Sequence, residues 1–316
     1  MIPTPDYVHF LGTEYLDGYV EQGGAAVKFL VVEDDLTAAQ AQARLLELAR
    51  TRGYLAVGVD AAVTRVHLLE ELFFEVARQV DWDALALATA RRAATAAGYP
   101  PPAGVIDLSS LATHHGVEAR ELKRDLDRAL QHAVYRDYGM VQEFRIAMLR
   151  LCQAGLQTGQ VTEAEHGAVL EWLRGELRQI SALRSALIFR KIARHNARQM
   201  LFSLAHWLSL NGRSGLVLVL DVRRLTVARR PILEERSGRY YTRASLLDAY
   251  ELLRQLIDNT DELANCAVFA IASPELLTDP ARGIDAYQAL KLRIFDEVRD
   301  RNRDNPFSSL VRLGAA

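Results

Sequence analysis

Carboxylates follow two of the stretches that read as buried strands. Residues 215–221, Gly-Leu-Val-Leu-Val-Leu-Asp, are an apolar run that ends in Asp221, and an acidic turn at 33–35 follows the apolar run 27–32. Because ligands bind outside the carboxyl ends of the strands in open α/β sheets, we expect these carboxylates to lie at one binding edge. An aspartate in the position of Asp221 holds Mg²⁺ in nucleotide-binding sites. A second interpretation stays open, in which Asp221 only caps the following turn.

The turn after residues 27–32 differs from a phosphate-binding loop. A P-loop uses Gly-x-x-x-x-Gly-Lys-Ser/Thr, whose backbone N–H groups and lysine surround the phosphates. Residues 33–39 instead read Glu-Asp-Asp-Leu-Thr-Ala-Ala, and residue 222 is a valine where a water-polarising glutamate would stand. Three carboxylates in this turn would repel a triphosphate, because like charges a few ångströms apart repel strongly. We therefore expect a degenerate nucleotide site without catalytic residues, formed by Glu33, Asp34, Asp35, Thr37 and Asp221.

The elements that position these residues alternate between strands and helices. Strands are expected at 27–32 and 54–59, each followed by a helix, at 37–52 and 66–80. Later strands at 215–221 and 266–272 are separated by a helix that opens at Ser245, and a last helix is expected at 284–301. This alternation indicates βαβ units and a parallel sheet.

The middle of the chain reads differently. Pro100 to Pro102 interrupt the pattern, and residues 108–178 are helical in pattern with no convincing strand. Another helix, at 188–210, leads into the strand at 215–221. The sequence therefore predicts an α/β fold with a parallel sheet and an all-helical insertion. The predicted parts are the first part of the core at 1–99, the insertion at 100–182, and the second part of the core at 183–316.

Four segments resemble a known family. They are Val-Lys-Phe-Leu at 27–30 and the segments 197–208, 250–258 and 267–272, which stand in the same order and spacing around the strand 215–221. They resemble bacterial AAA-like P-loop ATPases associated with BREX (bacteriophage exclusion) and related helicase-containing anti-phage systems. The resemblance implies a P-loop ATPase core with a helical insertion, acting beside a helicase or other defence proteins. The family's phosphate loop corresponds to residues 32–39, and its Asp-Glu pair corresponds to Asp221 and Val222.

These departures from the family predict a noncatalytic ATPase-like subunit, which acts as a scaffold or regulator and binds no cofactor. Its expected partners are proteins: an active ATPase paralogue, a helicase or another defence subunit, in a homo- or hetero-oligomer. One alternative keeps ATP and Mg²⁺ at Asp221, with an unrecognised phosphate site or one completed by a partner. Another alternative is a DNA-binding adaptor that uses no nucleotide.

Arginines gather in the loop 223–243. Arginines can pair with phosphates and tyrosines can stack on bases, so this loop is a candidate nucleic-acid or partner surface. A solvated loop or an arginine-carboxylate interface with a protein is the competing interpretation, because Glu234 and Glu235 interrupt the run. The candidate residues in the loop are Arg223, Arg224, Arg229, Arg230, Arg239, Tyr240 and Arg243.

A second basic group lies before residue 200. Four cations recur there at helical spacing and would form one stripe on a helix. This stripe is either a nucleic-acid contact or an ordinary solvated face. Its residues are Arg190, Lys191, Arg194 and Arg198.

In the last predicted helix, Arg293 could act as an arginine finger toward a neighbouring ATP site. The mixed charges around Arg293 favour a salt-bridged helix instead.

Composition narrows the functional class further. The formal net charge is -2, so any site for a polyanion must be local. Cys152 and Cys266 are the two cysteines, and neither has the spacing of a disulfide framework or a metal site, which fits a reducing cytoplasm. The sequence has no apolar run of the roughly 20 residues that cross a membrane. We expect a cytoplasmic protein without a metal site.

Overall fold

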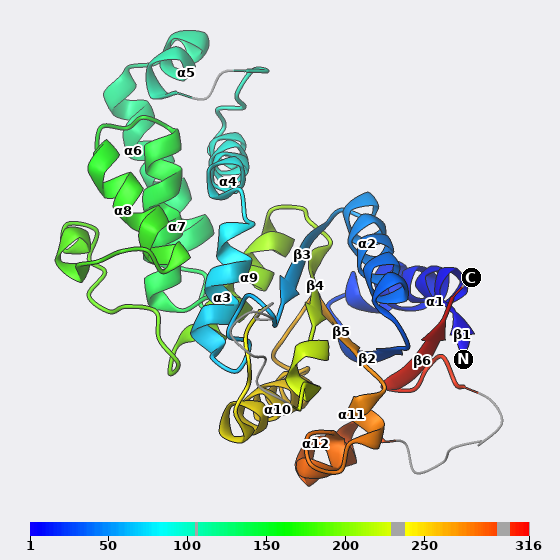
Figure 1. Cartoon of the computed structure of the whole chain (residues 1–316). Helices are drawn as coiled ribbons and strands as arrows, with labels where there is room; N and C mark the ends of the chain where they lie inside the picture. The colour runs from blue at the N-terminus through cyan, green and yellow to red at the C-terminus, as the bar shows by residue number, and fades with distance from the viewer. Residues whose placement is uncertain (105–106, 229–237, 296–303, 316) are drawn as a thin grey trace. The chain divides into compact units, whose positions relative to one another are not determined.

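Six parallel strands form one sheet in the computed structural model, which describes residues 1–104, 107–228, 238–295 and 304–315 (Figure 1). The sheet has the order β1-β6-β2-β5-β4-β3, and all neighbouring strands are parallel. The strands are β1 (Ile2–Pro3), β2 (Ala25–Val32), β3 (Tyr54–Asp60), β4 (Gly215–Asp221), β5 (Cys266–Ala272) and β6 (Leu310–Gly314). The predicted α/β, P-loop NTPase-like fold class is confirmed.

Two compact units divide the chain. One consists of residues 1–76 and 213–316 and contains the sheet, and the other consists of residues 77–212 and is helical. The helices of the sheet unit are α1 (Thr4–Phe10), the π-helical η1 (Leu11–Val20), α2 (Asp35–Thr51), α3 (Leu69–Arg78, of which residues 77–78 belong to the helical unit), η4 (Arg223–Thr226), α10 (Arg243–Asp258), α11 (Glu275–Thr278), η6 (Ile284–Ala286) and α12 (Gln288–Ile294).

The central strands are apolar along their whole length because both faces of the sheet are covered. Every residue of β2, β4 and β5 is buried. On one face these strands pack with α1, η1 and α2 in a single apolar cluster. Gly215 allows β4 to begin where it does: its φ is 137°, and a Cβ atom there would lie 2.0 Å from the carbonyl oxygen of Asn265.

The second unit has helices as its regular elements throughout its described residues. They are α4 (Trp82–Ala96), α5 (Leu108–His115), α6 (Ala119–Leu130), the π-helical turn η2 (Gln131–Tyr135), α7 (Gln142–Gly155), α8 (Glu163–Arg174), η3 (Ile180–Leu183) and α9 (Ala197–Leu210). Three aromatic rings join the unit's first and last helices to α7. Trp82 stacks on Trp207 with ring centroids 6.2 Å apart, and Phe144 contacts both edge-on. This packing lies within the compact unit 77–212, which contains the segment 100–182 where the insertion is predicted.

Several elements differ from the sequence prediction. The helix α4 and the short strands β1 and β6 were not predicted, and the helix expected at 188–210 begins only at Ala197. There the Asn196 side chain accepts a hydrogen bond from the Ala193 backbone at 2.8 Å and holds a turn ahead of the helix. The last helix, expected at 284–301, is seen as η6 and α12, and residues 296–303 lie outside the described part.

Candidate functional site: the carboxyl edge of the sheet

Asp221 at the end of β4 is bound on both carboxylate oxygens by one arginine. Its side chain is largely buried, with the residue 7% exposed. The Arg223 guanidinium donates from Nε to Oδ1 at 3.0 Å and from Nη2 to Oδ2 at 2.6 Å, and the Arg223 backbone N–H also donates to Oδ1 at 3.1 Å. This two-pronged geometry is the strong form of an arginine-carboxylate pair. The cation beside Asp221 is therefore the chain's own arginine.

Arg223 also links β4 to the acidic turn after β2. Its Nη1 forms an ion pair with Asp35, which is otherwise fully exposed. The hydrogen bond to Asp221 raises the pKa of Arg223 above its ordinary value. The structure thus places Asp35 and Asp221 at the same edge of the sheet, joined by one guanidinium.

Asp34 occupies the start of α2, the position from which a P-loop helix points its N–H groups at phosphates. Its side chain accepts hydrogen bonds from the Thr37 backbone N–H at 2.7 Å and from the Thr37 hydroxyl at 3.0 Å. These bonds lower the pKa of Asp34, and Thr37 itself is buried. Asp34 is therefore the N-cap of α2, and its carboxylate accepts hydrogen bonds at the positive end of the helix dipole. Glu33 is exposed beside it.

The arrangement does not fit a bound Mg-nucleotide. The groups that would meet a phosphate are carboxylates, and the carboxylate that would meet a magnesium ion already accepts four hydrogen bonds from Arg223. Among the described residues no group of three or more histidine, cysteine, aspartate and glutamate side chains is placed to hold a metal ion.

Cys152 and Cys266 are buried, and burial raises the pKa of each thiol to about 12. Neither cysteine is poised as a nucleophile at neutral pH.

The described arginines of the loop 223–243 hold that loop to the sheet unit. Arg224 donates to the Arg239 carbonyl at 2.6 Å, Arg239 donates to the Val63 carbonyl, and Arg243 donates to the Ala281 carbonyl at 2.7 Å. These arginines therefore use donors within the fold. Arg229 and Arg230 lie outside the described residues.

Arg282 is a residue that the sequence analysis missed. It is buried, and its guanidinium donates to the carbonyls of Leu225 at 2.8 Å and Tyr241 at 2.7 Å. It also lies 5.4 Å from the centre of the Tyr240 ring. Arg282 thus fixes both ends of the loop, and Tyr240 packs against it. The isolated arginine in Ala-Arg-Gly at 281–283 carries no signal that would have indicated this role.

The predicted basic stripe before residue 200 does not form, because the residues stand in two different backbone conformations. Arg190, Lys191 and Arg194 precede α9 in an irregular segment, and Arg198 alone lies in the helix. Lys191 donates to the Arg178 carbonyl at 2.9 Å. The four cations are therefore not one helical face.

Arg293 in α12 forms an ion pair with Asp258 at 3.0 Å, at the end of α10. Asp258 also pairs with Arg254 of the same helix. The salt-bridged interpretation of this helix agrees with the structure. A role of Arg293 toward a neighbouring subunit stays a prediction.

None of the helices within the described residues is both long and apolar enough to span a membrane.

A family model described as BREX system ATP-binding protein BrxC/D matches residues 106–315, which is more than half of the chain. The matched span contains Asp221 and Arg223 but not the acidic turn at 33–35. No curated protein and no solved structure matches the chain.

Proposed function

The chain belongs to the BREX system ATP-binding protein BrxC/D family and so has a role in a BREX anti-phage system, in which we propose that it is a noncatalytic ATPase-like subunit. The observation that carries the proposal is the pairing of Asp221 with Arg223. Both oxygens of the carboxylate that would serve magnesium are held by a guanidinium, at 3.0 and 2.6 Å. A metal ion would have to displace an ion pair that is already satisfied.

The helix start supports the same proposal independently. Asp34 caps α2 through two hydrogen bonds from Thr37, so the phosphate position carries a negative charge of the protein. In an active P-loop site a lysine and glycine N–H groups face the phosphates. The charges of this edge are the reverse of those that bind a triphosphate.

A subunit with this fold and without turnover serves as a scaffold or regulator. Membership in a multi-subunit defence system supports protein partners, and the partner classes that fit are an active ATPase paralogue, a helicase or another defence subunit. The chain would then have a structural role in the assembly, as one member of a homo- or hetero-oligomer. This role needs no nucleotide at Asp221.

Calorimetry with MgATP tests the proposal directly. The wild-type protein is expected to give no binding heat and no ATP hydrolysis above background. The Arg223→Ala variant releases Asp221, and Arg224→Ala is the matched control, because Arg224 lies in the same turn and its hydrogen bonds within the described residues go to backbone carbonyls. Wild-type hydrolysis that disappears on Asp221→Ala would refute the noncatalytic assignment.

ATP binding is the second candidate function, and the family's own description favours it. In that case the phosphates would be held by a partner subunit or after Arg223 moves away from Asp221. Tight MgATP binding by the wild-type protein, without hydrolysis, would support this candidate over a nucleotide-free scaffold.

A DNA-binding adaptor is the third candidate and depends on the loop 223–243. Charge reversal at Arg229 and Arg230 is expected to lower duplex binding and its salt dependence if the loop contacts phosphates. Unchanged binding in a gel-shift titration would remove this candidate.

A further inference from the structure

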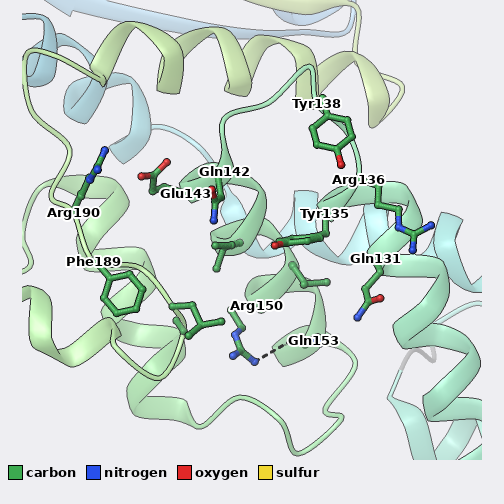
Figure 2. Close-up of a pocket in the computed structure, with 14 residues that line it drawn as sticks. Gln131, Tyr135, Arg136, Tyr138, Gln142, Glu143, Arg150, Gln153, Phe189 and Arg190 are labelled. Carbon is green, nitrogen blue, oxygen red and sulfur yellow. Dashed lines mark hydrogen bonds between the residues drawn. The ribbon is translucent and has the colours of Figure 1, made fainter.

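The helical unit contains an open hollow of about 810 Å³ between η2, α7 and the segment 186–190 (Figure 2). Tyr135 projects toward the middle of the hollow, Phe189 and Arg190 lie on one side of it, and Arg136 lies on the opposite side. All the residues that line the hollow belong to the helical unit, and none of them is part of the sheet edge described above. It is lined by both aromatic and cationic side chains.

Aromatic and aliphatic side chains are unusually exposed here. Ten large apolar side chains are strongly exposed in the described part of the chain, and four of them line this hollow: Tyr135, Tyr138, Leu187 and Phe189. Tyr138 is 84% exposed and Phe189 is 63% exposed. Single exposed apolar residues are common, but a cluster marks a binding surface.

Cations surround these rings. Arg136 and Arg190 are exposed, and neither has an ion-pair partner within the described residues. Arg145 lies over two rings, 5.6 Å from the centre of Tyr135 and 4.8 Å from that of Tyr138. Glu143 is the acidic side chain that lines the hollow. The surroundings of the exposed rings are therefore positive in balance.

A basic strip continues from this hollow along α6. A second hollow of about 630 Å³ shares Gln131 and Arg136 with the first and is lined by five cations and one carboxylate, Asp127. Arg120, Arg124 and Arg128 recur every fourth residue on α6, so they stand on one helical face. Arg124 and Arg128 approach carboxylates only at 3.7 to 4.0 Å and are 67% and 77% exposed. On a chain of net charge -2 this strip is a local concentration of positive charge.

We propose that the hollow and the strip beside it bind single-stranded nucleic acid. Phosphates would lie along the arginines of α6 and Arg136, and bases would stack on Tyr138, Tyr135 and Phe189. Proteins that bind single strands combine these two features, a cationic track and aromatic platforms. A duplex keeps its base faces covered, so it can use the cations but not the rings. An acidic protein segment would also match the charge, and the experiment separates it by competition.

The test is fluorescence anisotropy with a labelled 20-nucleotide oligothymidylate and the full chain, titrated from 50 to 200 mM salt. Wild-type binding is expected to weaken as salt rises. Arg136→Glu with Arg190→Glu should lower affinity at least about tenfold. It should also reduce the slope of log K against log salt concentration by about 1.4, because each phosphate contact to a single strand contributes about 0.7. Tyr138→Ala should lower affinity by about fivefold or more and leave the slope unchanged, because stacking releases no counterions.

The matched control is Arg44→Glu with Arg50→Glu, two exposed arginines of α2 that produce the same change in net charge. This control is expected to bind like the wild type. Phe189→Ala provides a second aromatic variant, and circular dichroism checks that each variant is folded.

Three results would overturn the proposal. The first is absence of wild-type binding to the oligonucleotide. The second is an equal loss in the Arg44 and Arg50 control, which would mean that only net charge matters. The third is full affinity in both aromatic variants together with equal competition by duplex DNA or polyglutamate. That result would assign the surface to phosphates of any form or to an acidic protein.

Discussion

The sheet edge and the hollow of the helical unit treat their charges in opposite ways. At the sheet edge Asp221 is held by Arg223, and Asp34 is held by the start of α2. In the hollow, Arg136 and Arg190 are exposed without a carboxylate partner in the described part, beside Tyr138. Charges that are satisfied internally hold the fold together, whereas exposed charges beside exposed rings are available to ligands. A likeness to an ATPase fold therefore does not place recognition at the ATPase site.

Arg223→Ala is the change with the largest expected effect on the first half of this comparison. It leaves the buried Asp221 carboxylate without its partner, which should lower the free energy of unfolding by about 2 to 3 kcal/mol, less than for a fully buried pair because Arg223 is partly exposed. Urea denaturation measures the loss. Arg224→Ala, which within the described residues removes hydrogen bonds to carbonyls, should cost about 1 kcal/mol.

The double variant Asp221→Ala with Arg223→Ala sharpens this test. If the two side chains depend on each other, the double variant loses less stability than the sum of the two single variants. Additive losses, or equal losses in Arg223→Ala and Arg224→Ala, would show that the sheet edge is not closed by this pair.

The sequence could predict the sheet edge better than the hollow of the helical unit. The apolar runs of β2 and β4 are typical of strands buried on both faces, and the parallel order then places Asp221 and the turn 33–35 at one edge. The loop 223–243 contains many arginines, and no local sequence pattern indicates which of them pairs with Asp221. Only the packed structure distinguishes Arg223 from Arg224.

The hollow could not be predicted because it is assembled from distant segments. Tyr135 and Phe189 are more than fifty residues apart in the chain, and the helix expected at 188–210 would have placed Arg190 on a continuous stripe instead. The short strands β1 and β6 were missed for a related reason. A strand of two to five residues carries too few positions for an apolar period to be recognised.

Lys28 allows a pH test of a third arrangement of charge, a buried cation that has no carboxylate partner among the described residues. It is 4% exposed in β2 and donates to the carbonyls of Phe307 at 2.6 Å and Ser308 at 3.0 Å. Burial lowers its pKa from 10.5 to about 8. Above pH 8 the Lys28 side chain therefore holds more protons in the unfolded chain than in the folded chain, so this group raises stability with pH, by about 1.5 kcal/mol between pH 8 and 9.5.

Urea denaturation of the wild type and of Lys28→Met at pH 7.5, 8.5 and 9.5 measures this contribution as the difference between the two proteins. The buried thiols of Cys152 and Cys266, whose pKa values burial raises, ionise first in the unfolded chain and therefore lower the stability of both proteins over this range. Tyr7 and Tyr54 act in the same direction at higher pH. An equal pH dependence in the two proteins would mean that Lys28 does not make this contribution.

The Asp34 cap should have a smaller effect. Asp34→Ala removes the acceptor for the Thr37 N–H and is expected to lower the melting temperature by about one to three degrees, while Asp34→Ser should restore most of the loss. Asp81→Ala, which removes the equivalent cap of α4 in the helical unit, is the matched comparison. Because hydrogen bonds lower the pKa of Asp34, its contribution is present at neutral pH and disappears only as the pH falls through that lowered value. An Asp34→Ala variant with unchanged melting would mean that water satisfies the helix start equally well.

The smallest expected effect belongs to the open region, and it is the test that can break the comparison. Tyr138→Ala and Arg136→Glu should each change the free energy of unfolding by no more than about 0.5 kcal/mol, because exposed side chains away from caps and buried networks contribute little. Urea denaturation of both variants, beside Arg223→Ala, measures the contrast. Tyr138 does stack with Arg145, 4.8 Å from the ring centre, so a loss above about 1 kcal/mol would mean that this ring serves the fold. Near-neutral stability combined with weakened oligonucleotide binding would instead show that the rings are held in the open for a ligand.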